Sequence, residues 1–160
     1  MNLFITIVLL SCVIVLGDWR NWKSYHPTML YIALCNLTYN FITGSKKLWV
    51  FVSPFLGHNV TDALYIFVVT PAIAFLFLSK YPPRHRLVYI LGFAIAFSLI
   101  EWIQHEAGFI TYQHGWSFGW SVQFYLVMFP MLRLHHRLPV VAYVLSVGIT
   151  YFYMKVFGFA

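Results

Sequence analysis

Long apolar segments alternate with short polar segments along the whole chain, a pattern that predicts helices crossing a bilayer. Six apolar segments can be drawn, approximately Asn2–Gly17, Met29–Thr43, Val60–Ser79, Leu87–His105, Gly119–Leu132 and Leu138–Gly158. Several are shorter than the about 20 residues needed to span a hydrocarbon core, so they tilt little or extend into the interface. The pattern predicts an all-α fold, a polytopic transmembrane helix bundle with about six spans.

Two parts of this pattern are weak. The second apolar segment contains Asn36, Thr38 and Asn40, so five spans and one re-entrant piece are the alternative. The segment Leu48–Leu56 is interrupted by Pro54 and is too short to span, so we expect it at the interface. There is no long hydrophilic linker and no repeat of domain size, which predicts that all 160 residues form a single integral membrane domain.

Composition supports a membrane protein. Hydrophobic residues make up 61% of the chain and charged residues only 9%, whereas a soluble domain has roughly a quarter charged residues. So few charges cannot cover a water-facing surface of this size. Cys12 and Cys35 lie in apolar segments without a C-x-x-C motif and are interpreted as small core residues. The apolar run continues past Cys12 to Leu16, which indicates a retained helix and not a cleaved signal.

The distribution of lysine and arginine predicts the orientation. Seven lie in the first, third and fifth loops, namely Arg20, Lys23, Lys80, Arg84, Arg86, Arg133 and Arg137. Three lie elsewhere, namely Lys46, Lys47 and Lys155. Cytoplasmic loops are enriched in these residues, so six spans place both termini outside. The inner basic clusters are expected to contact anionic lipids, and the net charge of +6 does not indicate nucleic acid because it is spread over loops.

Three of the four acidic residues, together with three histidines, lie in the predicted outer half of the protein. They are His58, Asp62, Glu101, His105, Glu106 and His114. His58 and Asp62 are four residues apart, as are Glu101 and His105, and residues four apart share a helix face. The third and fourth segments are antiparallel and joined by a short loop, so we predict that Asp62, Glu101 and His105 converge near the outer face.

This cluster is compatible with several roles. A polar site for a small solute or ion is the leading hypothesis, because ionisable groups within a span are costly and usually functional. Carboxylates and imidazole also suit a divalent metal, with Glu101, His105 and Asp62 as candidate ligands, or a proton relay. A structural alternative makes Asp62 a helix cap and Glu101 with His105 a hydrogen-bonded pair. No H-E-x-x-H, Gly-rich phosphate loop or Gly-x-Ser-x-Gly motif occurs.

Other features are less specific. Asn36 and Asn40 lie on one helix face and are predicted to bond to other helices, with lining of a solute cavity as the alternative. Pro71 and Pro130 lie inside predicted spans and favour kinks. Residues 115–121 repeat Gly-Trp-Ser at a four-residue interval, which favours an interfacial anchor or an aromatic surface beside the acidic cluster.

A set of short aromatic motifs carries a resemblance to a known family. They are Asp18-Trp19, Trp22, Tyr25 and Pro27-Thr28 after the first span, then Leu48-Trp49, Pro71, Glu101, Tyr112 and Gly115-Trp116. Over nearly its whole length the chain resembles an uncharacterised family of small multi-pass membrane proteins from Bacillus- and Clostridium-type bacteria. The resemblance implies a bacterial plasma membrane and supplies no activity.

Together these observations lead to one expectation and two alternatives. We expect a small membrane protein that binds or passes a small solute or ion through a polar site near its outer face. An intramembrane metal-dependent enzyme that uses Glu101 and His105 is the first alternative. A structural or accessory subunit of a membrane complex is the second, and the small size fits a homo-oligomer or a partner subunit.

Overall fold

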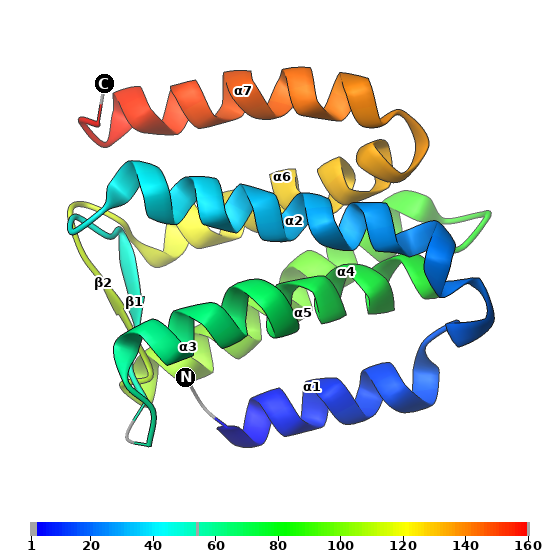
Figure 1. Cartoon of the computed structure of the whole chain (residues 1–160), viewed down its shortest axis with the longest axis horizontal. Helices are drawn as coiled ribbons and strands as arrows, with labels where there is room; N and C mark the ends of the chain where they lie inside the picture. The colour runs from blue at the N-terminus through cyan, green and yellow to red at the C-terminus, as the bar shows by residue number, and fades with distance from the viewer. Residues whose placement is uncertain (1–2, 54, 160) are drawn as a thin grey trace.

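The computed structural model describes residues 3–53 and 55–159 and has six helical segments, as the apolar pattern predicts (Figure 1). The helices are α1 (Leu3–Leu16), α2 (Trp22–Thr43), α3 (His58–Leu64) continuing into α4 (Thr70–Ser79), α5 (Arg86–Glu106), α6 (Phe118–Arg137) and α7 (Pro139–Val156). A short 3-10 turn, η1 (Trp19–Asn21), precedes α2. The predicted all-helical bundle is confirmed, with one small addition of strand described below.

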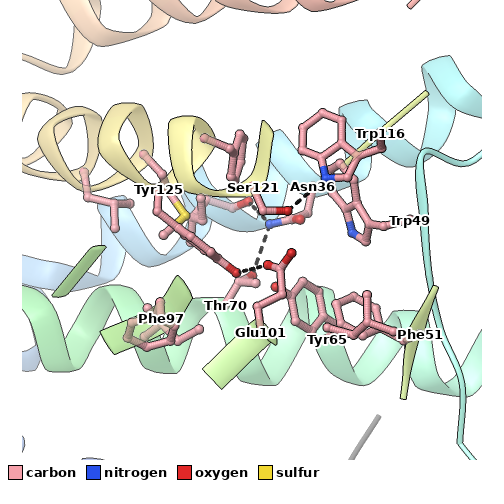
Figure 2. A pocket seen from close by; sticks show the side chains of 16 residues that line it. Asn36, Trp49, Phe51, Tyr65, Thr70, Phe97, Glu101, Trp116, Ser121 and Tyr125 are labelled. Carbon is pink, nitrogen blue, oxygen red and sulfur yellow. Dashed lines mark hydrogen bonds between the residues drawn. The ribbon is translucent and has the colours of Figure 1, made fainter. Parts of the chain in front are cut away.

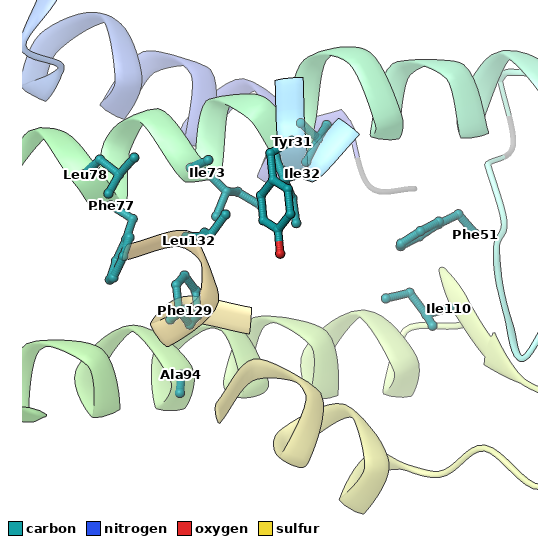
Figure 3. Packing of buried hydrophobic residues seen from close by; sticks show 12 residues of the cluster. Tyr31, Ile32, Phe51, Ile73, Phe77, Leu78, Ala94, Ile110, Phe129 and Leu132 are labelled. Carbon is teal, nitrogen blue, oxygen red and sulfur yellow. The ribbon is translucent and has the colours of Figure 1, made fainter. Parts of the chain in front are cut away.

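The helix α4 forms the centre of the bundle. Its residues from Thr70 to Phe75 are all buried, and it packs against α1, α2 and α6. Ala72 and Ala74 allow neighbouring helices to approach closely, while Phe77 fills the space toward α6, where its ring lies 5.1 Å from that of Phe129 (Figure 3). Small residues at close helix contacts and large ones between them give an interdigitated core.

One turn of π-helix, η2 (Tyr65–Val69), joins α3 to α4 within a continuous helix. The Thr70 amide donates to the Tyr65 carbonyl instead of the Ile66 carbonyl, and the Thr70 hydroxyl donates to Ile66 at 3.2 Å in its place. Pro71 follows directly and has no amide hydrogen to give to the Phe67 carbonyl. The irregularity that Pro71 predicted is therefore a π-turn whose carbonyl at Ile66 is satisfied by a side chain.

Two short strands, β1 (Trp49–Phe51) and β2 (Ile110–Tyr112), pair antiparallel at one end of the bundle. Trp49 lies opposite Tyr112 and Phe51 opposite Ile110. The segment Leu48–Leu56, expected at the interface, thus contains a strand, because its backbone groups find partners in a loop distant in sequence. This pairing holds the loops after α2 and after α5 at the same end of the bundle (Figure 1).

Several helices are long and apolar enough to cross a membrane. Among the described residues, three qualify by length and composition, namely His58–Ser79, Arg86–Glu106 and Pro139–Val156. The pair Phe4–Leu16 and Trp19–Thr43, bent by 83°, would make a fourth if it counts as one span. Only 6% of the apolar window of α7 and 11% of that of α5 is buried, so both helices present broad apolar surfaces to their surroundings.

Candidate functional site

The carboxyl group of Glu101 lies inside the bundle and accepts two tyrosine hydroxyls, of which that of Tyr125 is seen in Figure 2. Tyr112 on β2 donates to Oε1 at 2.7 Å, and Tyr125 on α6 donates to Oε2. The strand pairing positions Tyr112, while the packing of α5 against α6 positions Tyr125. Two donors from separate elements fix the orientation of this carboxyl group.

A cavity of about 50 Å³ adjoins Glu101. Its polar lining includes Asn36, Thr70 and Ser121, and aromatic rings such as those of Trp49 and Tyr65 form much of the remaining wall (Figure 2). This volume is enough for a small number of waters or a small ligand head group, since one water requires only about 10–15 Å³ of such space. The cavity thus combines a carboxyl group, neutral polar atoms and aromatic faces.

The neutral polar groups of the cavity form two separate sets of hydrogen bonds. Asn36 Nδ2 donates to the Ile32 carbonyl at 3.0 Å and to Thr70 Oγ1 at 3.3 Å, which links α2 to the end of the π-turn. Elsewhere in the lining, Trp116 Nε1 donates to Ser121 Oγ at 2.9 Å. Within residues 3–53 and 55–159, Asn36 Oδ1 accepts no hydrogen bond, so it can serve a ligand.

No cationic side chain of the described segments pairs with Glu101. His105 does not bond to it directly. Instead the His105 ring stacks on Tyr112 with centroids 4.4 Å apart, and its Nδ1 lies 3.0 Å from the Ile110 carbonyl oxygen. Burial, and then the hydrogen bond to Glu101, raise the pKa of Tyr112 above its ordinary value, so this hydroxyl stays protonated and able to donate.

Asp62 belongs to a different group of charges. It forms an ion pair with Lys47, and His58 Nε2 lies 3.5 Å from its Oδ2. Lys47 Nζ also lies 3.1 Å from His58 Nε2. Asp62 is the fifth residue of α3 and does not cap it, because Gly57 occupies the cap position. The pairing of His58 with Asp62 at four-residue spacing is present, with Lys47 as an added partner.

The predicted convergence on a metal site is not found. Among the residues that the structure describes, no group of three or more His, Cys, Asp or Glu side chains could hold a metal ion. Asp62 is neutralised by Lys47, while Glu101 turns toward tyrosines, so the two carboxylates have separate partners. Glu106 and His114 are exposed at the same end of the bundle.

Of the two asparagines for which bonds to other helices were predicted, one makes such a bond and the other bonds within its own helix. Asn36 crosses to Thr70 and lines the cavity, as both of its predicted roles require. Asn40 instead donates to the Asn36 carbonyl of its own helix at 3.0 Å, so its predicted interhelical bond is wrong among the described residues. Sequence reasoning missed Lys47 and the two tyrosine partners of Glu101. The chain has 11 tyrosines, and no local pattern distinguishes Tyr112 or Tyr125 from the others.

Comparison of the chain with protein-family models, with curated protein sequences and with solved structures finds no match.

Proposed function

We propose that this chain is a polytopic protein of a bacterial plasma membrane that binds a small cationic solute at Glu101. The observation that carries the proposal is the Glu101 carboxyl group, which borders a cavity and has two neutral donors but no cationic partner among the described residues. A bound cation would supply the missing counter-charge. We therefore assign the positive charge to the ligand and not to the protein.

A membrane location is supported by the apolar surfaces of α5 and α7, which lipid would cover without a polar coat. In the six-span arrangement, the sheet end of the bundle faces outward, and the basic end, with Lys80 and with Arg133 in the last turns of α6, faces the cytoplasm. Glu101 then lies slightly below the outer surface. A carboxylate at that depth costs a few kcal/mol unless it is paired or protonated, so such residues are retained mainly for function.

The surroundings favour a monovalent cation or a small ammonium group. A hard divalent metal needs several charged oxygen ligands, and among the described residues Glu101 is the only carboxylate in the lining of this cavity. Asn36 Oδ1 and the serine and threonine hydroxyls offer neutral acceptors, and the faces of Trp49 and Tyr65 attract positive charge. A protonated amine could be held by this combination of acceptors and aromatic rings.

The proposal is tested by measuring thermal stabilisation of the purified protein with sodium, potassium, ammonium and methylammonium chlorides at constant ionic strength. At a ligand concentration of about 100 times Kd, a ligand that binds only the folded state adds about 2.7 kcal/mol to the free energy of unfolding. We expect at least one of these cations to stabilise the wild type and to lose this effect in Glu101→Gln.

Glu106→Gln is the matched control, because Glu106 is an exposed carboxylate five residues further along the same helix. Cation-dependent stabilisation that persists in Glu101→Gln, or that is lost equally in Glu106→Gln, would contradict a binding site at Glu101.

A further inference from the structure

A second and larger hollow lies beside the Glu101 cavity. It is a groove of about 490 Å³ between α2, α6 and α7, a volume typical of small-molecule sites. Its walls are mainly apolar, with side chains that include Cys35, Ile42, Val127, Met131, Val147 and Met154. In Figure 1, α7 lies apart from α2, and α6 lies behind them. The groove is thus a long apolar surface open along one side of the bundle.

The groove adjoins the Glu101 cavity. The two hollows share lining residues, among them Ile32, Asn36, Trp49, Trp116, Phe124 and Met128. Asn36 stands at this junction, with its carbonyl oxygen available. Tyr153 also lines the groove, and its buried hydroxyl makes no hydrogen bond within the described part of the chain. Polar atoms therefore lie where the groove adjoins the Glu101 cavity, and the groove lining also includes Thr38, Thr43 and Thr150.

A bridge between side chains lies near one end of the groove. The Tyr31 hydroxyl and Ser146 Oγ are 2.6 Å apart and connect α2 to α7, and the ring of His135 stacks on Tyr31 with centroids 4.1 Å apart. From Tyr31 to Thr43 the α2 wall rises by about 18 Å at 1.5 Å per residue. The groove is therefore elongated along α2, with this bridge near one end and the Glu101 cavity against its wall around Asn36.

We infer that the ligand is a single-chain amphiphile with a primary ammonium head, whose head occupies the Glu101 cavity and whose alkyl chain lies in the groove. This inference rests on the proposed cation site and extends it. The charge of Glu101 selects a cationic head, and a cavity of about 50 Å³ admits an ammonium group but not a sugar or a large phosphate ester. The apolar walls beyond Asn36 suit one extended chain.

Because bilayer lipid solvates an alkyl chain about as well as a protein groove does, the chain contributes mainly through fit, and the head provides most of the binding energy. Chain binding should therefore depend on the shape of the groove, while head binding should not. Variants that change only the shape of the groove should therefore weaken binding of the alkyl chain and leave binding of the head group unchanged.

The probe is dodecylamine with a photoactivatable diazirine in the middle of its chain, and the control probe is the matching dodecanol. We expect the amine to label groove residues of α2, α6 or α7, and labelling to fall at least tenfold in Val147→Trp, which fills the groove. Val144→Trp is the matched control, since Val144 is similarly exposed on α7 but does not line the groove. Thr150→Phe narrows the groove from the next turn and serves as a second variant.

Stabilisation by methylammonium distinguishes failure of this inference from failure of the cation site. If methylammonium requires Glu101 but the diazirine amine labels other surfaces, or labels Val147→Trp and Thr150→Phe as well as wild type, the chain does not lie in the groove. Equal labelling by the alcohol probe would overturn selection of a cationic head. If neither methylammonium nor the amine depends on Glu101, both the inference and the proposed function are wrong.

Discussion

Tyr112 on β2 donates its hydroxyl to Glu101 Oε1 on α5 over 2.7 Å, and so links a loop strand to a polar group inside the helical bundle. The bond couples the sheet, formed by two loops distant in sequence, to the cavity of the candidate site. The site therefore depends on the sheet as well as on the helices.

Replacing either tyrosine should destabilise the protein through the same carboxyl group. We expect Tyr112→Phe and Tyr125→Phe each to lower the free energy of unfolding by about 1.5–3 kcal/mol, the range for hydrogen bonds to charged groups. Each loss should shrink in a Glu101→Gln background, which a double-mutant cycle in mixed micelles would measure. Tyr151→Phe, at an exposed tyrosine on α7, should change stability by less than about 0.5 kcal/mol. Equal losses with and without Glu101 would show that the tyrosines act through packing alone.

The ion pair between Lys47 and Asp62 should stabilise the start of α3. Both side chains are largely shielded from solvent, so Lys47→Met should leave an unpaired carboxylate and cost about 1.5–3 kcal/mol in the free energy of unfolding. Lys46→Met is the matched control, because Lys46 is an exposed neighbour without an ion pair among the described residues. Adding Asp62→Asn to Lys47→Met should recover part of the loss. If Lys46→Met and Lys47→Met cost the same, the pair contributes nothing specific.

The contact of α1 with α4 should tolerate no side chain at Gly17. A Cβ there would lie 2.4 Å from the Phe75 ring and 2.5 Å from the Val13 carbonyl oxygen, and Phe75 is fully buried. Gly17→Ala should therefore cost about 1–3 kcal/mol of stability through overpacking. Gly148→Ala, at a position in α7 with open space around it, should instead be neutral or stabilising by up to about 1 kcal/mol. Unfolding midpoints of the two variants would show whether Gly17→Ala lowers stability and Gly148→Ala does not. An unchanged midpoint in Gly17→Ala would contradict the close packing of α1 against α4.

The proposed topology can be tested by labelling whole cells with an impermeant thiol reagent. With Cys12 and Cys35 changed to serine, a cysteine at position 113 should react from outside and one at position 84 should react only after permeabilisation. Both positions are exposed in the structure, so access depends on the side of the membrane and not on burial. The reverse labelling pattern would invert the orientation.

Most helices could be predicted from sequence because their apolar runs are nearly continuous and end at polar or charged residues, although the run within α2 contains Asn36, Thr38 and Asn40. The run from Val60 to Ser79 matches the described helix His58–Ser79 closely, including the position of Pro71. The strands could not be predicted in this way. Each has only three residues, and β1 forms because β2, about sixty residues further along the chain, offers its backbone groups.

The site was predicted only in part for a related reason. Helical spacing identified Glu101 and the pair of His58 with Asp62, since residues four apart on a helix lie close together. The partner of each carboxylate comes from another element: Lys47 from a loop, Tyr112 from a strand and Tyr125 from α6. Such contacts depend on how helices rotate against one another, which a single sequence does not encode locally.

The π-turn has a consequence for the ancestry of this site. In a regular α-helix, side chains five residues apart point about 140° away from each other, yet Tyr65 and Thr70 both line the Glu101 cavity. The wider turn, which adds one residue, brings them to the same side. Insertion of one residue into an ancestral α-helix is the simplest origin of such a turn. In a lineage of related chains, we expect members one residue shorter here to retain the bundle and to lack this cavity.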